Sequence, residues 1–440
     1  MPTEWINAAE AARRLGVKQA SLYSYVSRGV LTRRKADGSR ASLFSATEVE
    51  GLARRGRPRR APGPAELVIE TELTEITGDQ LRYRGMDAIA LARSRGFEQV
   101  AALLWTGTLG DGGDGNLDDR GRVLWEAPAP AVAAGSAAQA ALPPGTLPLE
   151  RLQVIVPALA AADPLRLHLD PPAVIAAGRC LIAGMVDCLP VAAGGPVLGN
   201  GQAPRAAEAG RGDIRGNGTG RERRTRGGTV AERLVPKLCP ADPGAGLIDV
   251  VRAALVLLAD HELAASTLAA RVAASMRADP YAVVATGLGA VGGTLHGGAS
   301  FGAEVMLRSA PGPADAARAV GDLLRRGERI PGFGHFVYRR RDPRAVLLLD
   351  LLRAAAPGSE RLAVAEAVLA EARGRSLPEP NIDFALAALA VMAGMIPGAG
   401  EAIFAVARAA GWVAHALEEY VRRTPIRPRG IYTGPIGPPG

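Results

Sequence analysis

From Leu247 towards its C-terminus the sequence reads as one helix after another, because apolar residues recur at helical spacing and strand-like alternation is scarce. Hydrophobic residues make up 48% of the chain and aromatic residues only 4%, so alanine, leucine and valine must form the core between these helices. At 440 residues the chain exceeds one average domain and has ample material for a core. We therefore expect an all-α protein.

Four short motifs interrupt the helical pattern. His296 and His335 stand beside glycines in LHGGA and PGFGHFVY, where the backbone can turn tightly and approach a ligand closely. His261 lies in DHEL, and Asp383 lies in PNIDF. Three histidines and one carboxylate suit metal binding, acid–base chemistry or the polarisation of carbonyls. A metal site is disfavoured, because no two of these histidines share a helix turn and cysteine is absent nearby.

The order of the motifs resembles the citrate synthase family. DHE…AST, LHGGA, PGFGHxVY…DPRA, PNIDF and RP…YTG follow one another as they do in that family. The likeness begins near Leu67, with TELTEITGDQLRYRGMDAIALA and FEQVAALLWTG, and it is weakest in the middle of the chain. The resemblance implies a large helical domain over residues 67–288 and 391–440, a small helical domain over residues 289–390, and a homodimer.

The resemblance also implies an activity, the condensation of acetyl-CoA with oxaloacetate and water to citrate and CoA. Asp383 would be the base that removes a proton from the acetyl methyl group. His296 would hydrogen-bond the thioester oxygen and stabilise the enol(ate), with Ser266 orienting its ring. His335 would polarise the keto carbonyl. Acetyl-CoA would be a co-substrate, and no cofactor would be bound permanently.

Positively charged residues match the family positions that hold the substrates. The expected oxaloacetate ligands besides His335 are His261, Arg344, Arg408 and, from the partner subunit, Arg427. Guanidinium groups suit carboxylates because their planar fork can donate two parallel hydrogen bonds. Arg339 matches a coenzyme A phosphate contact, with Arg340 as a helper. His415 shares a helix face with Arg408, and we interpret it as a core histidine.

Four positions depart from the family pattern: Ala264, Thr294, Ser300 and Phe336. None of them removes a proton-transfer group, but Ser300 and Phe336 flank the active histidines and bear on rate and substrate choice. One alternative is therefore a 2-methylcitrate synthase that uses propionyl-CoA. Another is a DNA-binding regulator whose synthase-like body senses acyl-CoA or oxaloacetate. Retention of His296, His335 and Asp383 favours the enzyme, because a sensor need not keep the base.

The N-terminal region carries the whole net charge. Residues 1–62 hold thirteen Lys/Arg against five Asp/Glu, which equals the +8 of the full chain. The sequence predicts a capped helix from Asn7, a second helix from about Gln19 to Ser27, a basic hairpin over residues 33–40, and a third helix that begins with a capping box at Ser45. A basic module on a neutral body predicts a polyanionic partner.

This region resembles the winged helix-turn-helix of excisionase and MerR-type proteins. The resemblance implies a DNA-binding domain over residues 1–53 and a linker over 54–66. The candidate DNA-binding residues are Lys18, Gln19, Ser21, Tyr23, Arg28, Arg33, Arg34, Lys35 and Arg40. The alternative is a solvated basic helical pair used for packing or dimerisation.

Three further features bound the protein's setting. Residues 196–232 include a Gly/Arg-rich stretch that we expect to be a disordered, solvated loop. No apolar run reaches the roughly 18–20 uncharged residues that cross a bilayer, so no membrane partner is expected. The first residues lack the pattern of a secretory signal, and three cysteines without metal spacing fit a reducing compartment. We expect a cytoplasmic protein.

Overall fold

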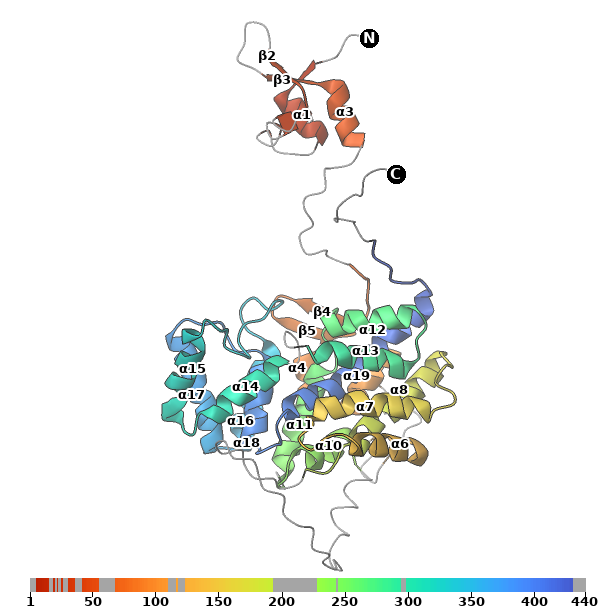
Figure 1. Cartoon of the computed structure of the whole chain (residues 1–440), viewed down its shortest axis with the longest axis vertical. Helices are drawn as coiled ribbons and strands as arrows, with labels where there is room; N and C mark the ends of the chain where they lie inside the picture. Colours follow the sequence, from red (N-terminus) through yellow and green to blue (C-terminus); the bar gives the residue numbers. More distant parts are fainter. Residues whose placement is uncertain are drawn as a thin grey trace, which may run out of the picture. The chain divides into compact units, whose positions relative to one another are not determined.

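The computed structural model describes residues 5–15, 19, 22, 25–26, 31–35, 42–54, 68–109, 116–117, 123–192, 228–242, 244–293 and 298–429. Contacts divide the chain into two compact units, residues 1–70 and 71–440 (Figure 1). The described chain is mostly helical, as predicted, with small antiparallel sheets added to the helices. Nearly all of the predicted linker lies outside the described residues.

The N-terminal unit combines a three-stranded sheet with short helices. Its elements are β1 (Trp5–Asn7), α1 (Ala8–Leu15), β2 (Arg33–Lys35), β3 (Ser42–Ser45) and α3 (Ala46–Arg54), with strand order β1-β3-β2. Gln19, Leu22, Tyr25 and Val26 are the described residues of the predicted second helix, and all four are helical. Leu22, Phe44 and Val49 are fully buried and form the core of this unit.

Two side-chain caps set the residues at which α1 and α3 begin. The Asn7 side chain accepts a hydrogen bond from Glu10 N–H at 2.8 Å, which starts α1 as predicted. Ser45 accepts from Glu48 N–H at 3.4 Å, so α3 also begins where expected. The Glu48 carboxylate, however, accepts from the backbone and hydroxyl of Thr32, at 2.6 and 2.9 Å. The predicted reciprocal capping box is therefore only half formed, and Glu48 instead ties α3 to the residue before β2.

The second unit begins with a small antiparallel sheet. Its strands are β4 (Thr74–Thr77), β5 (Gln80–Tyr83) and β6 (Met86–Asp87), followed by α4 (Ala88–Ser94), α5 (Phe97–Thr106), β7 (Asn116–Leu117) and β8 (Val123–Leu124). Asp87 ends the sheet and caps α4 by accepting from Ala90 N–H at 2.9 Å. The buried Tyr83 hydroxyl lies 3.0–3.1 Å from three backbone carbonyl oxygens at residues 256, 257 and 260. Tyr83 therefore anchors the sheet to the helical core.

Helix α19 (Ala399–Arg422) is the central element of the helical core (Figure 1). It packs against α5 and against the helices α7 (Pro148–Ala161), α8 (Pro171–Cys188), α11 (Gly244–Leu258), α12 (Ala265–Ser275) and α13 (Pro280–Val291). Two further helices are α6 (Ala129–Ala140) and α10 (Val230–Leu238). A Cβ at Gly287 would lie 2.6 Å from the Trp412 ring, so glycine is required for this close approach of α13 to α19. The predicted core of small and aliphatic residues is confirmed.

A second group of helices follows α13 in the chain. It comprises α14 (Gly298–Ser309), the short 3-10 helix η1 (Pro313–Asp315), α15 (Ala316–Arg325), α16 (Pro343–Ala355), α17 (Glu360–Gly374) and α18 (Ile382–Met392). Figure 1 shows these helices gathered on one side of α19. Helix α16 contacts α11, while α14 and α18 contact α19, so the group shares one compact unit with the rest of residues 71–440.

The structure bears on two predictions about single segments of the chain. Residues 196–227 of the predicted loop lie outside the described residues, but Thr229 caps α10, so residues 230–232 of that prediction are helical. By length and composition α8 alone, among the described helices, is long and apolar enough to span a bilayer. Half of that helix is buried against its neighbours. The core helix of a globular protein has the same properties.

Candidate active site

The PGFGH and PNIDF segments are bonded directly to each other. Gly334 N–H donates to the Glu379 carbonyl at 2.8 Å, and Asn381 N–H donates to the Gly332 carbonyl at 2.9 Å. The Asn381 side chain adds a third bond, to the Gly334 carbonyl at 2.8 Å. Gly332 has φ +80°, and a Cβ there would lie 2.8 Å from the backbone nitrogen of Phe384. Glycine is therefore required for this loop to close on the start of α18.

Asp342 joins the same loop to helices α16 and α18. As the N-cap of α16 it accepts from Arg344 N–H at 3.0 Å, and it also binds the Arg344 side chain at 2.8 and 3.0 Å. Its second oxygen accepts from Ile382 N–H at 3.0 Å. Burial acts to raise the pKa of Asp342, but Arg344 outweighs it and the pKa lies below its ordinary value. The pair thus stays charged although both side chains are buried.

His335 presents a hydrogen-bond donor towards Arg344. Its Nδ1 accepts from the backbone N–H groups of Val337 and Tyr338, at 3.0 and 3.3 Å, so the ring proton lies on Nε2. Arg344 Nη2 lies 3.4 Å from that Nε2. Both groups are donors, so neither satisfies the other. Burial, helped by Arg344, lowers the pKa of His335 to about 4, so the ring is neutral near pH 7.

His261 and Tyr338 extend this cluster. His261 Nε2 lies 3.0 Å from the Tyr338 hydroxyl oxygen, and the His261 and His335 ring centroids are 5.3 Å apart. Burial raises the pKa of Tyr338 to about 12, so the hydroxyl keeps its proton. The Arg344 guanidinium carbon lies 5.4 Å from the centre of the Tyr338 ring. Two imidazoles, one phenol and one guanidinium therefore form one contiguous cluster.

Arg408 and Asp383 bring opposite charges to the site from α19 and α18. Arg408 is buried, and its Nε donates to the Leu258 carbonyl at 2.8 Å. Asp383 is half-buried in the first turn of α18, where the Asn381 side chain accepts from its N–H at 2.9 Å. Burial raises the pKa of Asp383 to about 7 against the attraction of Arg344 and Arg408. A carboxylate with this pKa is suited to accept a proton near neutral pH.

The structure brings together five of the predicted site residues: His261, His335, Arg344, Asp383 and Arg408. His296 lies outside the described residues. Ser266 is fully buried in the first turn of α12. Arg427 is exposed beyond α19 and makes no hydrogen bond or ion pair with the described residues of this cluster. Arg339 and Arg340 are exposed beside Tyr338 in the chain.

Sequence reasoning missed Tyr338, Asp342 and Glu401. The signal for the first two was present, because Tyr338 ends the PGFGHFVY motif and Asp342 precedes Pro343 at a helix start. Glu401 is buried in the first turn of α19, and burial, then Glu304 and Asp383, raise its pKa to about 7. Nothing in the local sequence distinguishes Glu401 from an ordinary exposed residue at a helix start.

The remaining predicted positions differ in burial and in hydrogen bonding. His415 is fully buried, in agreement with its interpretation as a core histidine. Phe336 is fully exposed beside His335, with 102% of its reference area accessible. The buried Ser300 hydroxyl bonds to none of the described residues, and Ala264 begins α12 without a side-chain cap. In the described parts of the chain no three or more His, Cys, Asp and Glu side chains gather as a metal site.

The candidate DNA-binding residues are only partly described. Gln19, Arg33, Arg34 and Lys35 are exposed. The other five, Lys18, Ser21, Tyr23, Arg28 and Arg40, lie outside the described residues. The Arg34 guanidinium carbon lies 5.9 Å from the centre of the Trp5 ring, which holds one cation of β2 against β1.

Comparison with known proteins identifies the class to which this fold and site belong. A sequence model described as citrate synthase, C-terminal domain, matches residues 65–429. The chain therefore belongs to the citrate synthase family. It is similar to the citrate synthase of Haloferax volcanii, with 40% identity over 200 residues that cover 44% of this chain and 52% of that protein.

Other relatives extend the match. Citrate synthase 2 of Bacillus subtilis is 36% identical over 213 residues, which cover 47% of this chain and 56% of the relative. The chain thus spans about half the length of these first two curated relatives. A 2-methylcitrate synthase of Mycobacterium tuberculosis is 28% identical over 386 residues, which cover 86% of this chain and 91% of that protein.

A solved structure supports the fold. The crystal structure of citrate synthase from Thermotoga maritima aligns with a TM-score of 0.62 at 24% identity. The alignment covers 86% of this chain and 96% of that one.

Proposed function

We propose that this protein condenses acetyl-CoA with oxaloacetate and water, and so forms citrate and CoA. One observation carries the proposal. The donors His335 Nε2–H and Arg344 Nη2 lie 3.4 Å apart, and no described residue accepts from that Nε2–H, in the same site as the Asp383 carboxylate with its pKa of about 7. A keto acid supplies the acceptor oxygen, and a weak carbon acid supplies the proton.

The first step forms the carbon nucleophile. Asp383 removes a proton from the acetyl methyl group, and the electron pair left on carbon delocalises onto the thioester oxygen. By the family resemblance His296 donates a hydrogen bond to that oxygen. Weak carbon acids need such stabilisation, because the charge that develops on the oxygen is otherwise costly in a site shielded from water.

The second step joins the two substrates. The enol carbon attacks the keto carbon of oxaloacetate, and the electron pair of the C=O bond moves to the keto oxygen, which gains a proton. His335 and Arg344 stabilise this oxygen as its negative charge grows. Arg408 and His261 bind the carboxylates of oxaloacetate. Water then attacks the thioester carbonyl, and its C–S bond breaks to release citrate and CoA.

The same proposal assigns the exposed arginines and the assembly state. Arg339 and Arg340 are exposed beside the site and are suited to the phosphates of coenzyme A. Arg427 acts in the site of the partner subunit, which is consistent with its separation from its own chain's cluster. The protein would then work as a cytoplasmic homodimer without a permanently bound cofactor.

A thiol-release assay tests the activity. Acetyl-CoA is incubated with and without oxaloacetate, and free CoA and citrate are measured. We expect CoA release only with oxaloacetate, and one citrate formed for each CoA. Release without oxaloacetate would indicate a simple thioesterase, and no release under either condition would refute the synthase.

A mixing experiment tests the assignment of Arg427. Arg427→Ala and Asp383→Asn homodimers should each be inactive, whereas heterodimers hold one site with both residues intact. We expect part of the parent activity to return after subunit exchange. Continued inactivity after verified exchange would place Arg427 in its own chain's site or give it a purely structural role.

Use of propionyl-CoA, with 2-methylcitrate as product, is the second candidate. A fully exposed phenylalanine next to His335 is the observation that favours it, because an apolar side chain can contact an added methyl group. The relative with 91% coverage is named a 2-methylcitrate synthase. The test compares kcat/KM for the two acyl-CoA substrates in the parent and in Phe336→Ala. A propionyl preference that falls in the variant supports this candidate, and an acetyl preference in the parent opposes it.

For the N-terminal unit we propose DNA binding. The supporting observation is that β2 presents three adjacent exposed cations, Arg33, Arg34 and Lys35, on a strand paired antiparallel with β3, as a basic wing would. A body that senses acyl-CoA or oxaloacetate for such a module is compatible with this proposal, but the pKa of Asp383 favours a working enzyme.

Deletion of residues 1–62 separates these roles. We expect the shortened chain to keep its turnover and to lose DNA retention, and retention by the full chain should weaken steeply with salt. Equal DNA retention by both chains would refute the DNA-binding proposal. Loss of turnover together with the module would instead link that module to catalysis.

A further inference from the structure

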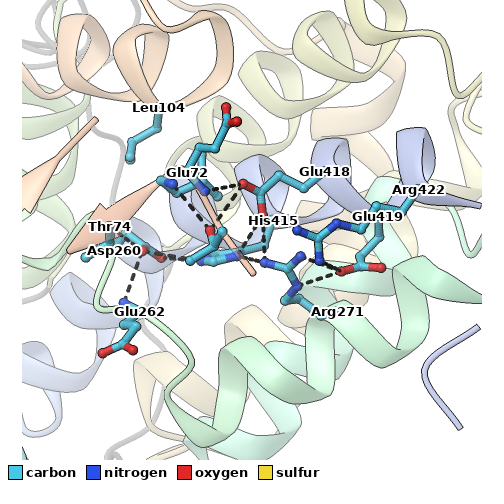
Figure 2. Close-up of polar contacts among 12 residues, drawn as sticks. Glu72, Thr74, Leu104, Asp260, Glu262, Arg271, His415, Glu418, Glu419 and Arg422 are labelled. Carbon is cyan, nitrogen blue, oxygen red and sulfur yellow. Dashed lines mark hydrogen bonds and ion pairs between the residues drawn. The ribbon is translucent and has the colours of Figure 1, made fainter. Parts of the chain in front are cut away.

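A second buried polar cluster lies next to His261 in the chain, and the chemistry described above does not use it. Its members, here called the His415 cluster, are Thr74, Asp260, Arg271, His415, Glu418 and Glu419 (Figure 2). They come from β4, from the connection between α11 and α12, from α12 and from α19. Asp260, Arg271 and His415 have no accessible surface at all. Groups buried this deeply are costly unless each finds a partner.

The partners of His415 fix its tautomer. Arg271 Nη1 lies 2.7 Å from His415 Nδ1, and a guanidinium can only donate, so Nδ1 is the acceptor. The ring proton therefore lies on Nε2, which faces the Asp260 carboxylate at 3.2 and 3.3 Å. His415 thus joins a cation on one side to an anion on the other, and an apolar residue of the same size could not.

Asp260 is held from several directions. Its carboxylate accepts from the Thr74 hydroxyl at 2.5 Å and from Glu262 N–H at 3.2 Å, in addition to His415. Its backbone carbonyl oxygen lies 3.1 Å from the Tyr83 hydroxyl. Gly411 permits the approach of α19, because a Cβ there would lie 2.5 Å from the Ala259 carbonyl oxygen. The peptide that precedes His261 is therefore fixed by the sheet, by its own turn and by α19.

Arg271 closes the cluster at its other end. It pairs with Glu418 at 2.7 Å and with Glu419 at 2.5 Å. Glu418 also accepts from the Thr71 hydroxyl at 3.2 Å and from Glu72 N–H at 2.8 Å. These contacts place Arg271 between two of the cluster's three carboxylates and join the cluster to the chain that leads into β4 (Figure 2).

We propose that His415, acting through Asp260, positions the imidazole of His261 to bind the keto acid. Asp260 and His261 are consecutive, and His261 must keep its ring 5.3 Å from that of His335 and its Nε2 3.0 Å from the Tyr338 hydroxyl. A shift of one ångström would break that hydrogen bond. His415 is thus a positioning residue, and the inference rests on the proposed function because His261 is taken to bind oxaloacetate.

Titration of oxaloacetate into the full-length protein by calorimetry tests this inference, with steady-state kinetics on the same variants. In His415→Gln the side chain keeps an amide donor and acceptor but changes their direction. We expect the Kd for oxaloacetate to rise about tenfold, the loss expected when one charge-assisted hydrogen bond is weakened. KM should rise with Kd, whereas kcat at saturation should change little, because His335 and Asp383 are untouched.

A double variant distinguishes positioning from a general structural effect. If His415 acts through His261, His415→Gln should cost no further affinity in a protein that already carries His261→Ala. Additive losses would overturn the inference. The milder Thr74→Val removes one hydrogen bond to Asp260 without changing side-chain size, and should raise Kd about threefold even if His415→Gln fails to fold.

Arg233→Met is the matched control. Arg233 is also buried, only 2% exposed, and it pairs with Asp187 at 2.8 Å between α8 and α10. This variant should lower the melting temperature without changing Kd for oxaloacetate. An equal rise of Kd in the control, or unchanged Kd in both His415→Gln and Thr74→Val, would refute the positioning role. A parent that neither binds oxaloacetate nor releases CoA would refute the proposed function instead.

Discussion

The His335 and His415 regions contain the same three residue types but differ in how their hydrogen bonds are satisfied. In each region a histidine lies against an arginine, and that arginine or the histidine itself contacts an aspartate. Around His415 every ring nitrogen meets a protein partner of the complementary kind. Around His335 two donors, Nε2–H and Arg344 Nη2, lie 3.4 Å apart, and no described residue accepts from that Nε2–H. The His415 cluster, whose ring bonds are made within the protein, is called the frame here, and the unused donor of His335 is where we expect a substrate oxygen to accept.

Exposure separates the two regions as well. Asp260, Arg271 and His415 have no accessible surface, so water cannot compete for the hydrogen bonds among them. His335 and Asp383 are only half-buried, so part of each residue is accessible to solvent. Their pKa values are nevertheless strongly shifted, to about 4 and about 7. The site therefore keeps His335 neutral and the pKa of Asp383 near neutral pH, whereas Arg271 of the His415 cluster is paired with Glu418 and Glu419.

The largest effect should come from Asp383→Asn. The amide keeps the shape of the side chain but cannot accept the methyl proton, so turnover should fall by about 10²–10⁴-fold. Stability should move the other way. The folded protein favours the protonated carboxyl, whereas the unfolded chain ionises Asp383 from about pH 4, so the free energy of unfolding falls between about pH 4 and pH 7, and the amide avoids that loss. Thiol release measures turnover, and urea unfolding at about pH 7.5 measures the free energy of unfolding. Turnover equal to the parent would remove Asp383 from the mechanism.

Replacement of His335 should have the second-largest effect on turnover. His335→Gln removes the directed Nε2 donor from the place where the keto oxygen gains charge, and loss of one such donor costs about 10²–10³-fold in kcat. The comparison predicts that His415→Gln leaves kcat nearly unchanged and acts on oxaloacetate affinity. Steady-state kinetics on both variants decide the matter. Similar kcat losses in the two variants would contradict the distinction between the catalytic site at His335 and the supporting His415 cluster.

The pH dependence should be about tenfold per unit on one limb. Asp383 must be ionised to act as a base, so kcat/KM should rise with pH up to about 7 and then level off. His335, with its pKa of about 4, stays neutral throughout this range and adds no limb of its own. Rates measured from about pH 5.5 to about pH 8.5 provide the test. A kcat/KM that does not change over this range would show that burial does not raise the pKa of Asp383.

The smallest expected effect tests how closely the frame is packed. Gly411→Ala places a methyl group against Asp260 and the Ala259 carbonyl, and such overpacking typically costs about 1–3 kcal/mol of unfolding free energy. Gly289→Ala is the control, because its Cβ would meet nothing within 4 Å. Urea denaturation of the two variants compares them directly. Equal stability of both would indicate that α19 can move away from Asp260 at no cost.

The sequence by itself determined the helical class, the aliphatic core and the residue types of the site. Helical spacing of apolar residues predicts helices because one face of each must be buried, and α11 to α19 confirm this reading. The glycines of PGFGH are a local feature, so the tight turn that they allow is visible in a few adjacent letters. Asn7 capping α1 is another local feature, and it too was predicted correctly.

Only the tertiary structure decided which polar residues meet. Thr74, Asp260 and His415 are joined by hydrogen bonds although as many as 341 positions (415 − 74) separate them in the chain. No periodicity records such a contact, because it depends on how β4, α12 and α19 pack together. For the same reason the sequence could not show that Asp342 bonds Ile382 as well as Arg344. Local sequence chooses the elements and their chemical groups, and packing then decides which of those groups are paired and which are left for a substrate.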